Sequence, residues 1–424
     1  MKLEFLGAAK EVGRSCVRVT TGELEILLDA GIKFAGRNTA YPEPEPTRAD
    51  AVVVSHCHLD HSGFLPRFFS NNNRKTPYMC TPPSEPLINF LLQDTIKIME
   101  SKKQKPYFGE RDLRNLPRFC HPMAYRKPYE FFEGTQLELL DAGHVLGSAQ
   151  ALIRPKGKEK PLLYSGDIKL SQSKMHLGAD ILSDEVGTLL VESTYALREH
   201  PDRPTLERQF CADLKNALAD GFSVLVPSFA VGRTQEMLMV LRDNNVRAQV
   251  YLDGMAQSAT KLAMDYSSYM RDARSFHDAV KMVHFVSEEK RKKIGENSPC
   301  IIVATAGMLE GGPILSYIKR LSKTGKLKIF LTGFQVPGTN GRKLVETGVL
   351  RIDGKPFKVN AEVRTYDFSA HAGRDELFDY VEQINPEKVF CMHGEAESCF
   401  TFAEQLKQRG FDAIAPEPGS VHEI

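Results

Sequence analysis

The chain has 424 residues, of which 42% are hydrophobic and 26% are charged, as in ordinary soluble globular proteins. Its 55 basic and 54 acidic side chains leave a formal net charge of +1, so no global positive field points to a nucleic-acid partner, although a local basic groove stays open. The eight cysteines form no CxxC pair, and no apolar run is long enough to span a membrane. We therefore expect a cytoplasmic protein with no membrane partner and no disulfide framework.

The chain up to residue 192 predicts a series of short strands with one long helix among them. Alternating apolar residues predict antiparallel strands at 2–6, 15–19 and 24–28. Helical periodicity appears at 86–101. Apolar runs then predict strands at 136–140, 149–154, 162–164 and 187–191.

The segment 55–61, Ser-His-Cys-His-Leu-Asp-His, directly follows the apolar run Ala-Val-Val-Val. On an extended segment His56 and His58 share a face and can point at one ion, while Asp60 and His61 leave a turn toward a second ion. Imidazole and carboxylate groups suit zinc or another borderline divalent metal. A histidine-rich solvent loop is the alternative, but such loops rarely follow a core strand so directly.

Four strand candidates carry a further acidic or histidine side chain at or just beyond their carboxyl ends, where open sheets place their sites. These side chains are His144, Asp167, Glu192 and His393, the last of them after a predicted strand at 388–391. We assign His56, His58 and His144 to one metal and Asp60, His61 and His393 to the other, with Asp167 as the bridge because a carboxylate offers two oxygens. Asp29 and Asp141 are interpreted as turn residues or as carboxylates that orient a ligand histidine.

From residue 197 onward the pattern changes to alternating helices and short buried strands. Helices are predicted at 206–219 and 232–244, and strands at 223–227, 249–253, 300–304 and 328–332. The glycine-rich turns after two of these strands match neither a P-loop nor a GxGxxG fingerprint, so we expect no nucleotide cofactor.

The histidine–aspartate pattern at 56–61, followed by His144, Asp167 and His393, resembles the ligand motifs of the metallo-β-lactamase superfamily. Within it, Val-Glu-Ser-Thr at 191–194, Phe-Ser-Ala-His-Ala-Gly at 368–373 and Met-His-Gly-Glu at 392–395 resemble motifs A, B and C of the β-CASP nucleases. Glu192 and the Ser-Ala-His form of motif B are similar to the endonuclease subunit of cleavage and polyadenylation specificity factor and its archaeal and bacterial homologues. We expect the form without KH domains, because the first predicted strand begins at residue 2.

The resemblance implies a mechanism in which hydroxide held by two zinc ions hydrolyses an RNA phosphodiester bond. His371 would protonate the leaving 3′-oxygen, Glu192 would orient its imidazole, and Asp60 is counted among the catalytic residues. Ser369, Arg233 and Arg342 are our candidates for contacts with substrate phosphates, although for each arginine a solvated surface position is the alternative. The chemistry itself does not separate RNA from DNA, and only the resemblance favours RNA.

The resemblance also implies an α/β architecture: an αββα metallo-β-lactamase sandwich built from residues 1–196 and 368–424, with an α/β β-CASP domain inserted at 197–367. Single-stranded RNA would run in the cleft between the domains. A homodimer, or association with other RNA-processing proteins, stays open, as does the balance between endonucleolytic and 5′–3′ exonucleolytic cleavage.

Three alternatives remain beside this hypothesis. One is a ribonuclease J-like exonuclease or a DNA-directed β-CASP nuclease. Another is a thioester or lactone hydrolase of the same fold, against which the long insert between Glu192 and His371 argues. The third is a non-catalytic scaffold, which such complexes contain, but inactive subunits typically lack ligands that this chain retains.

Overall fold

A computed structural model describes residues 1–35, 38–71, 76–101, 103–130, 134–295 and 298–424. The chain divides into two compact units. Unit 1 comprises Met1–Gln172, Leu177–Glu199 and His371–Ile424, and unit 2 comprises Ser173–His176 and His200–Ala370. The sequence placed the change of domain after residues 196 and 367, and the compact units change after 199 and 370.

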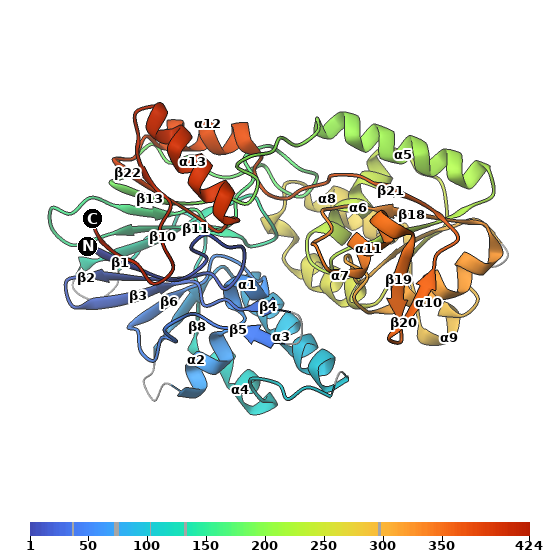
Figure 1. Ribbon diagram of the computed structural model, residues 1–424, viewed down its shortest axis with the longest axis horizontal. Helices are drawn as coiled ribbons and strands as arrows, with labels where there is room; N and C mark the ends of the chain where they lie inside the picture. Colours follow the sequence, from blue (N-terminus) through green and yellow to red (C-terminus); the bar gives the residue numbers. More distant parts are fainter. Residues whose placement is uncertain (36–37, 72–75, 102, 131–133, 296–297) are drawn as a thin grey trace. The chain divides into compact units, whose positions relative to one another are not determined.

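The first sheet of unit 1 has seven strands and lies between its core and the helices α1 to α4 (Figure 1). In spatial order the strands are β24 (Val421–Glu423), β1 (Lys2–Gly7), β2 (Cys16–Thr21), β3 (Leu24–Leu28), β6 (Ala51–Val53), β7 (Tyr78–Cys80) and β8 (Cys120–Pro122). The three predicted amino-terminal strands are confirmed as β1 to β3, and they pair antiparallel. From β3 onward the neighbours β6, β7 and β8 run parallel.

The second sheet of unit 1 also has seven strands. Their order is β23 (Asp412–Ile414), β22 (Lys388–Met392), β13 (Thr188–Glu192), β12 (Leu162–Tyr164), β11 (Ala149–Arg154), β10 (Gln136–Asp141) and β9 (Tyr129–Glu130). Because β12, β13 and β22 are parallel neighbours, the residues that follow them meet at one edge of the sheet.

The two sheets pack face to face around one apolar core, which contains side chains of both, such as Phe5, Val17, Leu139 and Phe390. A second core joins the outer face of the second sheet to the carboxyl-terminal helices. The helices of unit 1 are α1 (Leu59–Ser62), α2 (Leu65–Asn71), α3 (Ser84–Ser101), α4 (Glu110–Asn115), α12 (Arg374–Ile384) and α13 (Ala396–Gln408), and β4 (Lys33–Ala35) and β5 (Asn38–Ala40) form a small hairpin. Unit 1 is therefore an αββα sandwich.

Unit 2 is a parallel six-stranded sheet with helices between its strands. The strand order is β16 (Val283–Phe285), β15 (Val250–Asp253), β17 (Ile301–Ala304), β14 (Ser223–Pro227), β18 (Leu327–Leu331) and β21 (Glu362–Thr365). The helices are α5 (Arg203–Ala219), α6 (Arg233–Asp243), α7 (Met255–Asp265), α8 (Ala273–Lys281), α9 (Glu288–Arg291), α10 (Pro313–Leu321) and α11 (Asn340–Thr347), and β19 (Val349–Ile352) pairs with β20 (Lys355–Lys358).

The sequence did not indicate that Ser173–His176 belongs to unit 2. Lys174 forms ion pairs with Glu207 at 3.2 Å and Asp243 at 3.0 Å, and the carbonyl of Met175 accepts a hydrogen bond from the backbone of Arg271. These contacts are made by residues far away in the chain, so no local pattern reports them. Among the described residues, no helix has both the length and the apolar character that a membrane crossing requires.

Candidate metal centre

The histidines at 56 and 58 do not lie on a strand, so the predicted shared strand face is wrong. β6 ends at Val53, and His58 is already the N-cap of the short helix α1, which carries Asp60 and His61. The loop instead folds so that Nε2 of His56 lies 3.0 Å from Nδ1 of His58. Gly31 allows this close packing, because a Cβ there would lie 1.7 Å from the carbonyl oxygen of Asp60.

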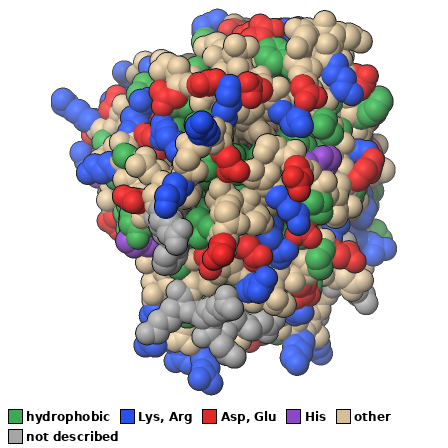
Figure 2. All heavy atoms as spheres, turned by 90° about the vertical axis from the view of Figure 1, so that its left-hand side faces the viewer, with side chains coloured by type: hydrophobic (Ala, Val, Ile, Leu, Met, Phe, Trp, Pro, Cys, Tyr) green, Lys and Arg blue, Asp and Glu red, His purple; other side chains and the backbone are tan. Residues whose placement is uncertain are grey.

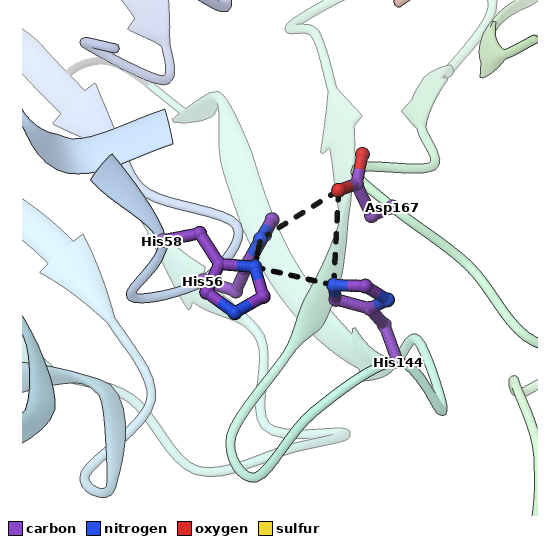
Figure 3. Close-up of side chains that lie close together, drawn as sticks. All are labelled: His56, His58, His144 and Asp167. Atoms are coloured by element: carbon purple, nitrogen blue, oxygen red, sulfur yellow. Dashed lines mark hydrogen bonds and ion pairs between the residues drawn. The ribbon is translucent and has the colours of Figure 1, made fainter. Parts of the chain in front are cut away.

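One group of ligand atoms brings together His56, His58, His144 and Asp167 (Figure 3). The three imidazoles and the carboxylate point toward one another, from the loop after β6, the loop between β10 and β11, and the end of β12. Nε2 of His144 lies 3.4 Å from Nδ1 of His58, and Oδ2 of Asp167 lies 3.7 Å from Nε2 of both His56 and His144.

A second group contains Asp60, His61 and His393, with Asp167 beside it. Oδ2 of Asp60 lies 3.9 Å from Nε2 of His61 and 3.7 Å from Nε2 of His393. The Asp167 carboxylate lies 3.3 Å from Nε2 of His61 through Oδ2 and 3.1 Å from Nδ1 of His393 through Oδ1. Asp167 thus stands between the two groups, as a bridging carboxylate must.

The third group joins Asp167 to Glu192 and His371. Nδ1 of His371 lies 3.1 Å from both carboxylate oxygens of Glu192, and Oε1 of Glu192 also accepts the backbone N–H of Ile168 at 2.8 Å. Burial lowers the pKa of His371, but the negative charges of Glu192 and Asp167 outweigh it and raise that pKa above its ordinary value.

The donor set fits zinc or a similar divalent metal, because it offers imidazole nitrogens and carboxylate oxygens in groups of three or four. Within the described part of the chain, three buried atoms at the site have no hydrogen-bond partner: Nε2 of His61, Oδ1 of Asp167 and Nδ1 of His393. Unsatisfied buried polar atoms are costly unless a ligand engages them, so their convergence on one point supports a metal centre.

The burial and the charges of the site shift the pKa values of its histidines in different directions. Burial, reinforced by His61 and His58, lowers the pKa of His56 well below its ordinary value. Burial opposes a charge on His393 as well, but the neighbouring carboxylates of Asp167 and Asp60 raise its pKa to about 10. Since metal ligation requires neutral imidazole, binding of divalent ions would release protons from this site.

Asp29, Asp141 and Cys57 were considered beside the candidate ligands, and the structure gives them different contacts. Asp29 accepts a hydrogen bond from Nδ1 of His61 at 2.6 Å, so it does orient one of the histidines. Asp141 instead accepts the backbone N–H of Gly143, and burial raises its pKa to about 7. Cys57 is fully buried outside the ligand groups, and burial raises its pKa to about 12.

The three candidates for phosphate contacts lie in unit 2. Arg233 is buried and forms a 2.5 Å ion pair with Glu236, which favours a structural role. Arg342 is exposed and pairs with Glu346 at 2.6 Å, and the carbonyl of Ser369 accepts a hydrogen bond from an arginine of α5. One face of the molecule shows basic and acidic side chains interspersed, with no patch of a single sign (Figure 2).

Sequence reasoning missed Ser55 and Tyr164, whose hydroxyls donate to Asp29, and Ser15, whose hydroxyl bonds to Tyr164. No spacing signal could have found them, because serine and tyrosine occur throughout globular cores and surfaces. Their partners are also distant in the chain, and only the folded sheets bring them together.

Comparison with known proteins agrees with this geometry. A model of the Beta-Casp domain matches residues 234–344, and a model described as the Zn-dependent metallo-hydrolase RNA specificity domain matches residues 356–416. A "Probable RNase MJ4" of Methanocaldococcus jannaschii is 40% identical, over 99% of both chains. The "RNase aCSPSF2" of Saccharolobus solfataricus is 32% identical over 98% of this chain and 84% of that protein.

Two further similarities have different weight. The "Transcription termination factor FttA" of Methanocaldococcus jannaschii is 34% identical over 96% of this chain and 69% of its own length. A crystal structure of a protein of unknown function from Enterococcus faecalis V583 superposes with a TM-score of 0.65 at 13% identity, covering 99% of both chains. At that identity the superposition reports a shared fold alone.

Proposed function

Because the chain belongs to the β-CASP family of zinc-dependent metallo-hydrolases, we propose that it is a zinc-dependent ribonuclease that hydrolyses phosphodiester bonds of single-stranded RNA. The observation that carries the proposal is the central place of Asp167, which belongs to two of the three groups of candidate residues and lies 3.3 Å from His61 and 3.1 Å from His393 of the other. The relatives named as ribonucleases supply the substrate class.

Two zinc ions per chain are the proposed cofactor. His56, His58 and His144 would hold one ion, Asp60, His61 and His393 would hold the other, and Asp167 would bridge them. When bound, such an ion pair supplies Lewis acidity and a nucleophile derived from water at neutral pH. The chain's own contribution is a preorganised ligand set, in which five side chains are buried and those of His58 and Asp60 are half-buried.

The proposed general acid is His371. Its Nδ1 faces both oxygens of Glu192, and Glu192 is itself held by the backbone of Ile168, so the imidazole orientation is fixed. With the Nδ1 proton directed at Glu192, the proton delivered to a leaving 3′-oxygen is the one on Nε2. His371 is partly exposed, with 21% of its side chain accessible, as a residue that meets substrate must be.

Substrate phosphates are proposed to contact Arg342 and Ser369. Arg342 is exposed near the start of α11, and its single ion pair with Glu346 is of a kind that costs little to exchange. Arg233 is less suited to this role than the sequence suggested, because Glu236 already engages its guanidinium in a buried pair.

The test is a time course with RNA labelled at its 5′ end or its 3′ end, with zinc-loaded wild-type protein and His371→Ala. We expect internal products from the wild type and at least about 100-fold slower cleavage by the variant. Mononucleotides released first from the 5′ end would indicate 5′–3′ exonucleolytic action instead. Hydrolysis of a thioester without cleavage of RNA, or equal RNA cleavage by both proteins, would contradict the proposal.

A further inference from the structure

A single buried carboxylate, Asp29, is linked to both ligand groups of the candidate metal centre, to His61 directly and to His56 through Ser55. It is fully buried at the end of β3 and accepts four hydrogen bonds. Oδ1 accepts the backbone N–H of Ser55 at 2.7 Å. Oδ2 accepts the hydroxyl of Ser55 at 2.9 Å, the hydroxyl of Tyr164 at 2.6 Å and Nδ1–H of His61 at 2.6 Å.

The protons in this network can be assigned by counting them. A serine hydroxyl has one proton, and that of Ser55 is donated to Asp29. Oγ of Ser55 also lies 3.1 Å from Nδ1 of His56, so it must accept a hydrogen bond from Nδ1–H of that ring. The hydrogen on Nδ1 directs Nε2 of His56 toward His58 and Asp167, where a metal ligand is required.

The same counting applies to Tyr164. Its one hydroxyl proton goes to Asp29, so the hydroxyl of Ser15, 3.0 Å away, must donate to the tyrosine oxygen. Tyr164 and Ser15 are both buried, with 2% and 0% exposure, so water does not replace either partner. Tyr164 is also the last residue of β12, the strand that leads to Asp167.

We propose that Tyr164 and Ser15 are positioning residues of the metal centre, acting through Asp29 on a histidine in each ligand group. Asp29 holds His61 directly and His56 through Ser55, which presents Nε2 of both rings to the ions. The inference rests on the proposed zinc site and adds residues to it that contact neither metal nor substrate. Because Tyr164 and His61 share Oδ2, the ion on the His61 side depends on Tyr164 more strongly.

The experiment compares Tyr164→Phe with Tyr380→Phe. Tyr380 is a matched control, because it is also fully buried in unit 1 and its hydroxyl bonds to Gln150, away from the ligands. Zinc affinity of the metal-free protein is measured by competition with a coloured chelator. We expect the association constant of the more weakly bound zinc ion to fall about 10-fold in Tyr164→Phe, to fall less in Ser15→Ala, and to be unchanged in Tyr380→Phe.

Thermal unfolding of the metal-free variants separates positioning from general stability. Tyr164→Phe and Tyr380→Phe should lose similar stability without zinc, whereas zinc should stabilise Tyr164→Phe less. Cadmium NMR of protein loaded with cadmium should show one of two resonances displaced in Tyr164→Phe. Equal zinc affinities for the two tyrosine variants would overturn the inference and leave the proposed ribonuclease intact.

Two outcomes keep the inference and the proposed function distinguishable. If wild-type protein binds no zinc, the proposed function fails, and this inference fails with it. If Tyr164→Phe does not fold, Ser15→Ala decides, because it removes only the donor to the tyrosine oxygen. Unchanged zinc affinity in Ser15→Ala would then contradict the proposal.

Discussion

Each unit buries an aspartate beside the carboxyl end of a parallel strand, and the two carboxylates have opposite surroundings. Asp253 ends β15 in unit 2 and is saturated by Arg291, at 2.7 and 2.9 Å, and by the Tyr317 hydroxyl at 2.8 Å. Asp167 follows β12 in unit 1, and its neighbours are imidazoles rather than a permanent cation. Among the described residues, Oδ1 of Asp167 has no hydrogen-bond partner.

The comparison shows that burial of an acid does not identify a functional site by itself. A guanidinium stays charged at every accessible pH, so the Arg291–Asp253 pair is complete without a ligand. Imidazoles can give up their protons to a metal ion, so the proposed divalent cation would complete the surroundings of Asp167. The chemistry of the neighbouring groups therefore separates a structural carboxylate from a candidate metal ligand.

Among the substitutions that test this contrast, Asp167→Asn should have the largest effect. The amide removes the charge shared by the two ligand groups, so we expect fewer than two zinc ions per chain and RNA cleavage reduced by about 10,000-fold. Elemental analysis and single-turnover cleavage measure the two quantities. Full zinc content with wild-type cleavage would show that Asp167 does not bridge metals.

His371→Ala separates proton transfer from metal binding. We expect kcat to fall by about 1,000-fold with zinc content unchanged, because His371 pairs with Glu192 and belongs to neither of the two groups proposed to hold the ions. His284→Ala, at an exposed histidine of β16, is the control and should cleave RNA as the wild type does. Loss of zinc from His371→Ala would instead assign this histidine to the metal centre.

The residues that the sequence grouped as candidate ligands do lie close together in the structure, but the chain presents them differently from what alternation indicated. Apolar runs mark buried strands, so the ends of β12, β13 and β22 could be located and their polar side chains grouped. Histidines two residues apart also suggested a strand, but the chain leaves β6 at Val53 and places them in a loop. Alternation cannot distinguish a strand from a tight loop here, because either can bring histidines two residues apart to one metal ion.

Other features depend on contacts that no local pattern encodes. The donors to Asp29 come from two segments, 55–61 and β12, and the segment 173–176 joins unit 2 through ion pairs with α5 and α6. Such contacts appear only after the sheets have formed, since the partners are far apart in the chain.

Asp253→Asn, in unit 2, is the counterpart of Asp167→Asn in unit 1. It leaves the Arg291 guanidinium without its carboxylate in a largely buried pair, so we expect the free energy of unfolding to fall by about 4 kcal/mol. Zinc content should be unchanged, because Asp253 is in none of the ligand groups. Urea unfolding followed by circular dichroism measures the free energy of unfolding, and elemental analysis measures the zinc content. Loss of zinc from Asp253→Asn would contradict the proposed difference between Asp253 and Asp167.

Buried His176 of unit 2 should make the stability of the folded protein depend on pH. Burial lowers its pKa to about 4, against the opposing effect of Glu236. Between about pH 6.5 and 4 the unfolded chain binds a proton that the native state excludes, so stability is lost as the pH falls, by about 1.4 kcal/mol per unit and ~3 kcal/mol in total. Urea unfolding of wild-type protein and His176→Phe across this range should show a shallower slope for the variant; equal slopes would contradict the assignment.

Arg342→Ala should have the smallest effect, and it asks whether unit 2 contacts substrate at all. Loss of one exposed phosphate contact should raise KM for RNA by about 3-fold at low salt and leave kcat unchanged, with the difference shrinking as salt screens the contact. Arg409→Ala is the matched control, because Arg409 is equally exposed in unit 1 and pairs with one glutamate, Glu382. If both variants shift KM alike, the effect is one of net charge, and Arg342 is no closer to the substrate than any other surface arginine.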